Sequence, residues 1–187
     1  GFNVNLTEKQ FIETIHKCGF SMIGQTGEIA PADKKLYALR DVTGTVASIP
    51  LITASIMCKK MAEGIDSLVL DVKWGTGAFM KTIEDATTLA KSMVRVGKAM
   101  NKGMVALLTD MNQPLGRTAG NALEIIESME CLQGQHAGED LMNITLALTA
   151  EMLVLGKKAE NTVAALEMLR GHIVSGAAFA KFKEMAV

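Results

Sequence analysis

Four polar side chains between residues 37 and 59 have the types and spacing of a binding site for a small polar ligand. Tyr37 and Arg40 lie one helical turn apart, and so do Ser55 and Lys59, so each pair would project from one face of a helix. Arginine and lysine supply two cations, and serine and tyrosine supply neutral hydrogen bonds. Such a set suits a planar ligand that is rich in carbonyl oxygens and can leave as an anion. Spacing alone nevertheless favours an ordinary solvated helix face.

A second candidate site lies where a turn enters a helix. The turn reads LGRT at residues 115–118, and Glu124 and Glu127 follow it at a spacing of three residues. One carboxylate could join backbone carbonyl oxygens here to hold a cation. Two acidic residues on an exposed helix face explain the same spacing, and without further evidence this simpler interpretation is favoured.

Asp71 and Lys73 stand two residues apart in an otherwise apolar run, so they share one face of a predicted strand. Charged side chains are costly in such a strand unless they are paired or face a site. They form either one wall of an active site or a structural ion pair near the strand end, and the sequence favours neither.

The glycine loop that follows this strand approaches two phosphate-binding motifs without completing either. Gly75 and Gly77 could begin a dinucleotide fingerprint, but Met80 stands at the third glycine position. In a P-loop, the residue before Lys81 would have to be glycine, and it is again Met80. A strand-to-helix turn that needs small residues is therefore the favoured interpretation.

The histidines and cysteines carry no recognisable nucleophile or metal signature. The histidines are scattered without partners at metal-ligand spacing, and we expect all three on the surface. Two cysteines look like helix packing residues, Cys18 and Cys58. The absence of any Cys-x-x-Cys pair argues against disulfides and zinc, and indicates a reducing, cytoplasmic compartment. The full set is His16, His136, His172, Cys18, Cys58 and Cys131.

Composition restricts the class of protein further. The 187 residues are 49% apolar and 21% charged, which indicates one globular domain or a large piece of one. Lysine and arginine number 19 against 20 acidic residues, a net charge of −1, so no nucleic-acid partner is expected. Polar residues interrupt every long apolar run, so no membrane partner, transmembrane helix or signal peptide is expected. Thirteen methionines predict a methionine-rich core.

Alternating strands and helices predict an α/β fold with part of a mostly parallel sheet, and ligands at the carboxyl ends of its strands. Pro50 should start or kink its helix, and Gly19 should end the first one. We predict helices at 7–18, 33–40, 43–63, 82–101, 118–132, 138–158, 161–171 and 176–186, and strands at 2–6, 20–23, 67–73 and 104–109.

Three segments resemble the thymidine and pyrimidine-nucleoside phosphorylases. They read GQTGEIAPADKKLYALRDVTGTVASIPLITASIMCKK at 24–59, DVKWGTGAFM at 71–80 and LLTDMNQPLGRTAGNALE at 107–124. The resemblance covers nearly the whole chain, and the segments LLTDMNQ and 147–157 are closer to the thymidine branch. It implies the α/β catalytic domain of the nucleoside phosphorylase and phosphoribosyltransferase type, flanked by helices.

The resemblance implies a pentosyltransferase of pyrimidine salvage. Thymidine or deoxyuridine would react with phosphate, the co-substrate, to give the free base and 2-deoxyribose 1-phosphate. Arg40 and Lys59 would act as catalytic donors to the departing base. No organic cofactor is implied, and the parent protein would be a homodimer. The residues that match pyrimidine-binding positions are Tyr37, Arg40, Ile52, Ser55, Ile56, Lys59 and Phe79, and those that match half of a monovalent cation site are Leu115, Thr118 and Glu127.

The resembling family is much longer, and this shapes the expectation for the chain alone. Residues 1–187 are expected to be a single partial α/β domain that is incomplete at both ends. An N-terminal helical domain, the phosphate loop and a C-terminal domain are expected to be absent, which would leave the isolated chain inactive. The alternatives are a broad-specificity pyrimidine-nucleoside phosphorylase, a non-catalytic pyrimidine-binding module, and a transferase that uses a phosphoribosyl donor.

Overall fold

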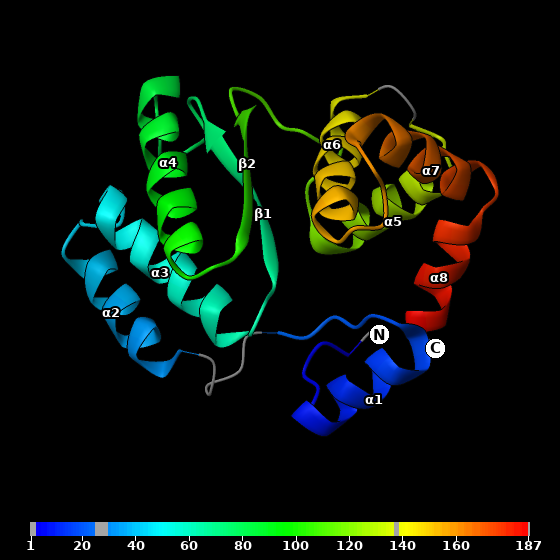
Figure 1. The fold of residues 1–187 in the computed structure, drawn as a ribbon, viewed down its shortest axis with the longest axis horizontal. Helices are drawn as coiled ribbons and strands as arrows, with labels where there is room; N and C mark the ends of the chain where they lie inside the picture. The colour runs from blue at the N-terminus through cyan, green and yellow to red at the C-terminus, as the bar shows by residue number, and fades with distance from the viewer. Residues whose placement is uncertain (1–2, 25–29, 137–138, 187) are drawn as a thin grey trace.

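The computed structural model describes residues 3–24, 30–136 and 139–186, which form eight helices and a two-stranded parallel sheet (Figure 1). The strands are β1 (Ser67–Trp74) and β2 (Gly103–Asp110). The helices are α1 (Glu8–Cys18), α2 (Pro31–Val42), α3 (Ile49–Ala62), α4 (Ile83–Ala99), α5 (Asn121–Leu132), α6 (Asp140–Leu155), α7 (Thr162–Val174) and α8 (Ala177–Ala186). The predicted α/β fold with a parallel sheet flanked by helices is confirmed.

Helix α4 makes the crossover between the two parallel strands. Ser67 pairs with Gly103 at the start of the sheet and Trp74 with Asp110 at its carboxyl end. Helices α3 and α4 pack on one face and α6 on the other, as Figure 1 shows. The side chain of Val72 enters the core between β1 and the first pair of helices. The loops that follow both strands therefore meet at one edge of the sheet.

The core beneath α3 and α4 is rich in methionine, as the composition predicts. Its buried members are Met57, Val72, Met80, Ala86, Leu89, Ala90 and Met93. Methionine is unbranched and fills irregular gaps, which compensates for the scarcity of aromatic residues.

Local signals place the ends of two helices. Thr7 accepts a hydrogen bond from the backbone of Gln10 and its own backbone is capped in return, which is the predicted capping box before α1. Gly19 ends that helix with φ 83°, a left-handed conformation that glycine adopts without strain. Pro50 lies in the first turn of α3, so the helix begins at Ile49 and not at residue 43 as predicted.

The two predicted N-terminal strands are wrong for the residues that the structure describes. Residues 3–6 and 20–23 adopt no regular strand, and Phe2 lies outside the described residues. The backbone N–H of Gly24 donates to the carbonyl of Val4 at 2.8 Å, but no ladder continues from this bond within the described ranges. Alternating side chains alone do not make a strand without a neighbouring strand to bond.

Close packing accounts for both glycines in the loop between β1 and α4. The N–H of Gly77 donates to the carbonyl of Met111 at 2.9 Å, and a Cβ at Gly77 would lie 2.8 Å from that oxygen. Gly75 has φ 121°, and a Cβ there would lie 2.8 Å from the side chain of Asn112. The loop packs against the residues that follow β2, which supports the strand-to-helix turn. No helix within the described ranges is long and apolar enough to cross a membrane.

We predict that Gly77→Ala lowers the free energy of unfolding by about 1–3 kcal/mol, because the new methyl group would collide with the Met111 carbonyl. Gly171, inside α7, is the matched control because a Cβ there meets nothing within 4 Å. Gly171→Ala should raise the unfolding free energy by about 0.5–1 kcal/mol. Urea unfolding measures both, and equal effects of the two substitutions would contradict the packing argument.

Candidate functional site

The predicted polar residues of α2 and α3 converge on the side chain of Lys59. Its Nζ lies 3.2 Å from the Ser55 hydroxyl and 3.0 Å from Oδ2 of Asp33, which belongs to the first turn of α2. The Ser55 hydroxyl also lies near enough to the Asp33 carboxyl to help lower its pKa, so the three groups form a closed triangle. Ser55 and Asp33 are buried, whereas the Lys59 side chain remains 28% exposed. The ammonium group is therefore held by two buried side chains and remains partly accessible to solvent.

The charge state of Asp33 follows from these contacts. Burial alone would raise the pKa of its carboxyl, but hydrogen bonds from Ser55 and Lys59, with the charges of Lys59 and Arg40, outweigh burial and lower the pKa. The carboxylate is therefore ionised at neutral pH. The opposite charges of Asp33 and Lys59 offset each other between the two helices.

Arg40 is buried, and its two terminal nitrogens donate hydrogen bonds to backbone carbonyl oxygens. Its Nη1 donates to the carbonyl of Leu51 at 3.1 Å, and its Nη2 donates to the carbonyl of Val46 at 2.6 Å. Its Nε is buried without a hydrogen-bond partner within the described ranges. The guanidinium also lies 5.2 Å from the centre of the half-exposed Tyr37 ring. The predicted pair thus meets, with Arg40 fixing the start of α3.

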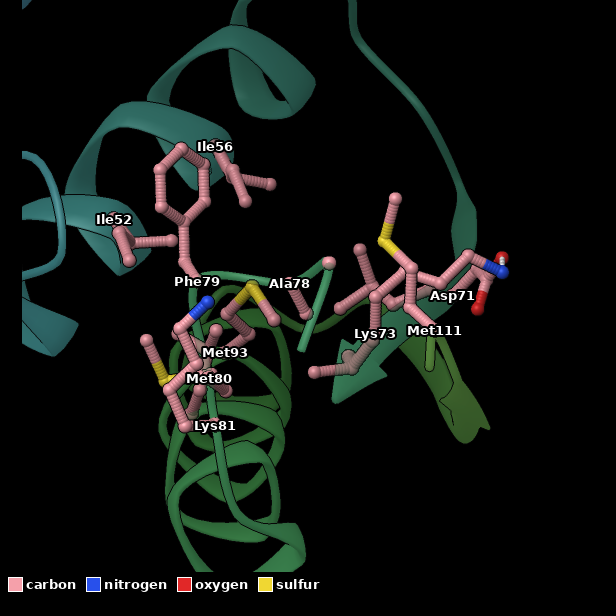
Figure 2. A pocket seen from close by; sticks show the side chains of 14 residues that line it. Ile52, Ile56, Asp71, Lys73, Ala78, Phe79, Met80, Lys81, Met93 and Met111 are labelled. Carbon is pink, nitrogen blue, oxygen red and sulfur yellow. Dashed lines mark ion pairs between the residues drawn. The ribbon is translucent and has the colours of Figure 1, made fainter. Parts of the chain in front are cut away.

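The three predicted apolar residues line one cavity of about 510 Å³ at the carboxyl ends of the strands. In Figure 2, Ile52 and Ile56 extend from α3 toward the ring of Phe79, which comes from the loop after β1. Phe79 is 61% exposed, so one side of its ring is free to contact a ligand. The structure thus gathers the predicted site into an apolar group and a polar group, and the polar group does not line this cavity.

Helix α3 connects the two groups. Ile52, Ser55, Ile56 and Lys59 have the spacing of residues on one helical stripe, so the cavity wall and the anchored ammonium are neighbours along the helix. A planar ligand that rests on the isoleucines would have its polar edge toward Lys59. The structure does not test the roles of these residues, which stay predictions.

Asp71 and Lys73 form an ion pair and also border the cavity, so the two interpretations of the sequence are compatible. Lys73 Nζ lies 2.7 Å from Asp71 Oδ2 and 3.1 Å from the hydroxyl of Thr109 on β2, and that hydroxyl donates to the Asp71 carboxylate. The ion pair and its hydrogen bonds use donors from both strands, Lys73 of β1 and Thr109 of β2. This pairing stabilises the carboxyl edge of the sheet from which the cavity wall is built.

The predicted cation-site residues border a second cavity, of about 380 Å³. Buried Glu127 accepts the N–H of Arg117 on Oε1 at 2.7 Å, and the N–H and hydroxyl of Thr118 on Oε2 at 3.1 and 2.6 Å. The Thr118 hydroxyl and the Arg117 N–H lower the pKa of Glu127, against the opposing effect of burial. Leu115 lines the same cavity.

This arrangement fits a cation only in part. A carboxylate offers about four lone-pair positions, and three are used at Glu127, so it could supply a single oxygen from Oε1. No group of three or more acidic, histidine or cysteine side chains within the described residues could hold a metal ion. A cation here would need backbone carbonyls, and its presence stays a prediction.

Two predictions about single residues are wrong. The side chain of His136 is only 11% exposed and lies 2.9 Å from Glu130 and 3.4 Å from Glu139. Its hydrogen bond to Glu130 raises its pKa against the effect of burial. Cys58 is exposed and packs into no core, whereas Cys18 is buried as predicted. His16 and His172 lie on the surface.

Asp33 is the residue that sequence reasoning missed. It precedes Tyr37 by four residues and Arg40 by seven, so a helical wheel places the three on one face. That spacing was available from the sequence. Its pairing with Lys59 was not, because the two residues belong to different helices.

Comparison with known proteins adds a second line of evidence. Residues 1–179 match the family described as "Glycosyl transferase family, a/b domain". The chain is 52% identical over 183 residues to the pyrimidine-nucleoside phosphorylases of Staphylococcus aureus strains USA300 and NCTC 8325. The match covers 98% of this chain and 42% of each relative, so the chain spans less than half the length of these relatives.

We predict that Glu127→Gln lowers the free energy of unfolding by about 1–3 kcal/mol near neutral pH, because a charged acceptor of three hydrogen bonds is lost. A lowered carboxyl pKa stabilises the fold above its ordinary value of 4.5, and this contribution disappears as the pH falls through the lowered pKa. The difference between wild type and variant should therefore shrink in acid. Urea unfolding at several pH values measures it.

The control is Glu167→Gln, at an exposed position of α7. This substitution should change the unfolding free energy by less than about 0.5 kcal/mol. A Glu127→Gln cost that stays constant from pH 7 into acid would contradict the role given to the ionised carboxylate.

Proposed function

Because the chain belongs to the glycosyl transferase family through its α/β domain, we propose that it forms the pyrimidine-binding side of a pyrimidine-nucleoside phosphorylase. The reaction would be the phosphorolysis of a pyrimidine nucleoside to a free base and a pentose 1-phosphate. The observation that carries the proposal is the Lys59 ammonium, anchored by Ser55 and Asp33 beside an apolar cavity wall on the same helix. The identity to pyrimidine-nucleoside phosphorylases supports it.

The chemistry requires a donor that meets charge as it develops. When phosphate attacks the anomeric carbon, the bond to the base breaks and the pyrimidine gains negative charge on its ring and carbonyl oxygens. A fixed cationic donor stabilises that charge more strongly than it stabilises the neutral substrate. Lys59 has the exposed donor, while both terminal nitrogens of Arg40 already bond to backbone carbonyls. We therefore assign the direct contact to Lys59 and a supporting positive charge to Arg40.

The nucleophile would be bound outside this chain. In the proposal, phosphate is the co-substrate and its ligands come from segments of the intact protein that residues 1–187 do not include. The isolated chain is then expected to bind base without turning it over. A homodimeric assembly, a cytoplasmic location and a monovalent cation at Glu127 remain predictions of the same proposal.

Within this function we propose thymidine as the preferred substrate. Ile52, Ile56 and Phe79 offer an apolar surface to the 5-methyl group of thymine. One buried methyl group in an apolar pocket is worth about 10–200-fold in kcat/KM. Comparison of thymidine with deoxyuridine tests the methyl contact, and comparison of deoxyuridine with uridine tests the sugar separately. Equal rates with all three nucleosides would favour the broad-specificity alternative.

We predict that Lys59→Met in the intact protein lowers kcat/KM for phosphorolysis by about 10–150-fold, the value of one hydrogen bond to a charged group. Lys60→Met is the matched control, because Lys60 is the next residue of α3 and pairs with Glu63 instead. It should leave kcat/KM within about twofold. Release of free base, followed by ultraviolet absorbance with and without phosphate, measures both variants.

The same assay separates the alternatives. Consumption of free base that requires a phosphoribosyl donor, with release of pyrophosphate and no dependence on phosphate, would indicate the transferase. Saturable binding of thymine to the intact protein without any turnover would indicate a non-catalytic module. Equal losses in Lys59→Met and Lys60→Met would contradict the assignment of Lys59.

A further inference from the structure

We propose that Asp33 is a positioning residue of the pyrimidine site, which acts with Ser55 to aim one N–H of Lys59 at the base. This inference rests on the function proposed above and deepens it. Asp33 itself would not touch the ligand. It would act through Lys59, whose Nζ lies 3.0 Å from its carboxylate.

The geometry of an ammonium group explains how two contacts fix the third. Lys59 Nζ has three N–H donors, arranged tetrahedrally. One is directed at Ser55 Oγ and one at Asp33 Oδ2, and the third has no partner among the residues that the structure describes. Because two directions are set by buried groups, the remaining direction is set as well. A flexible lysine is thereby turned into an oriented donor before any ligand arrives.

Stability alone gives a poor account of the carboxylate. Asp33 is 8% exposed, and a buried ion pair recovers its desolvation cost only when geometry and additional hydrogen bonds are good. An apolar side chain at this position would avoid that cost. The contacts with Ser55 and Lys59 supply these hydrogen bonds, and they also orient the exposed ammonium group of Lys59.

The same carboxylate lies within the field of Arg40, whose charge contributes to lowering the Asp33 pKa. Arg40 holds the carbonyls of Val46 and Leu51, at the entry to α3. Asp33 and Arg40 thus fix α3 from one face of α2, one through a side chain and the other through the backbone. A merely structural role for Asp33 is the competing explanation, and the experiment has to separate the two.

A double-mutant cycle on the intact protein makes that separation. The variants are Asp33→Asn, Lys59→Met and the double variant, with kcat and KM for thymidine phosphorolysis and the Kd for free thymine measured for each. Asn keeps the size of the side chain and an oxygen that can accept a hydrogen bond, and removes the charge. We expect Asp33→Asn to lower thymine affinity and kcat/KM by about tenfold in the wild-type background, and by less than about twofold in Lys59→Met.

Two controls complete the design. Asp66→Asn changes an exposed aspartate with the same chemistry and should leave kcat, KM and Kd unchanged. Asp33→Glu restores the charge at a longer reach, and we expect it to recover part of the kcat/KM lost in Asp33→Asn. Thermal unfolding of every variant shows which proteins are folded. If Asp33→Asn does not fold, the cycle is run with Asp33→Glu in both Lys59 backgrounds, with the same criterion of coupling.

The outcomes distinguish this inference from the proposed function. A wild-type protein that neither phosphorolyses nucleosides nor binds thymine would overturn the function and, with it, the inference. An active wild type in which the effects at Asp33 and Lys59 multiply independently would overturn the inference alone. Loss of thermal stability in Asp33→Asn with unchanged Kd, KM and kcat would do the same, since it would assign Asp33 to the scaffold.

Discussion

The ion pair between Asp33 and Lys59 is the contact on which the polar half of the site depends. It joins the first turn of α2 to the last turn of α3 across a buried interface, and Ser55 closes the triangle. Because α3 also packs on α4, anything that fixes α3 fixes its isoleucines over the sheet edge. One electrostatic contact therefore sets both the direction of a donor and the position of an apolar wall.

The apolar half depends on how closely two loops approach at the carboxyl edge of the sheet. Gly77 touches the carbonyl of Met111, and Met111 in turn donates its N–H to the carbonyl of Trp74 at 2.7 Å. This exchange locks the loop after β1 against the residues after β2. Phe79 leaves the locked loop toward α3, which gives the cavity one wall from the sheet edge and one from a helix.

Local signals predicted the elements that are stabilised locally, and failed where the tertiary structure decides. The capping box at Thr7 and the left-handed Gly19 could be predicted because each depends on nearby residues, and the two sheet strands because each is a long, mainly apolar run. The sequence could not decide whether residues 2–6 and 20–23 form strands, because a strand needs a neighbouring strand to bond. The alternation of side chains does not reveal such a neighbour. The enclosure of His136 between two glutamates and the pairing of Asp33 both depend on contacts between helices or across loops. The resemblance supplied Arg40 and Lys59 together, but only the three-dimensional structure shows that Arg40 bonds backbone carbonyls, while Lys59 keeps one N–H without a partner among the described residues.

In the proposed reaction the leaving base becomes anionic, and the difference between the two cations then has a chemical consequence. A bare cation would bind any anion strongly and would gain little as charge develops on a bound neutral base. Lys59 is paired with Asp33, and Arg40 is held by backbone carbonyls, so the Asp33 carboxylate offsets part of the attraction that the site would exert on a resting ligand. The donors of the site are nevertheless already oriented in the folded protein, so they need no rearrangement when charge develops. Interaction energy then grows mainly as the base acquires charge, which is the condition under which an electrostatic contact accelerates a reaction and does not merely tighten binding.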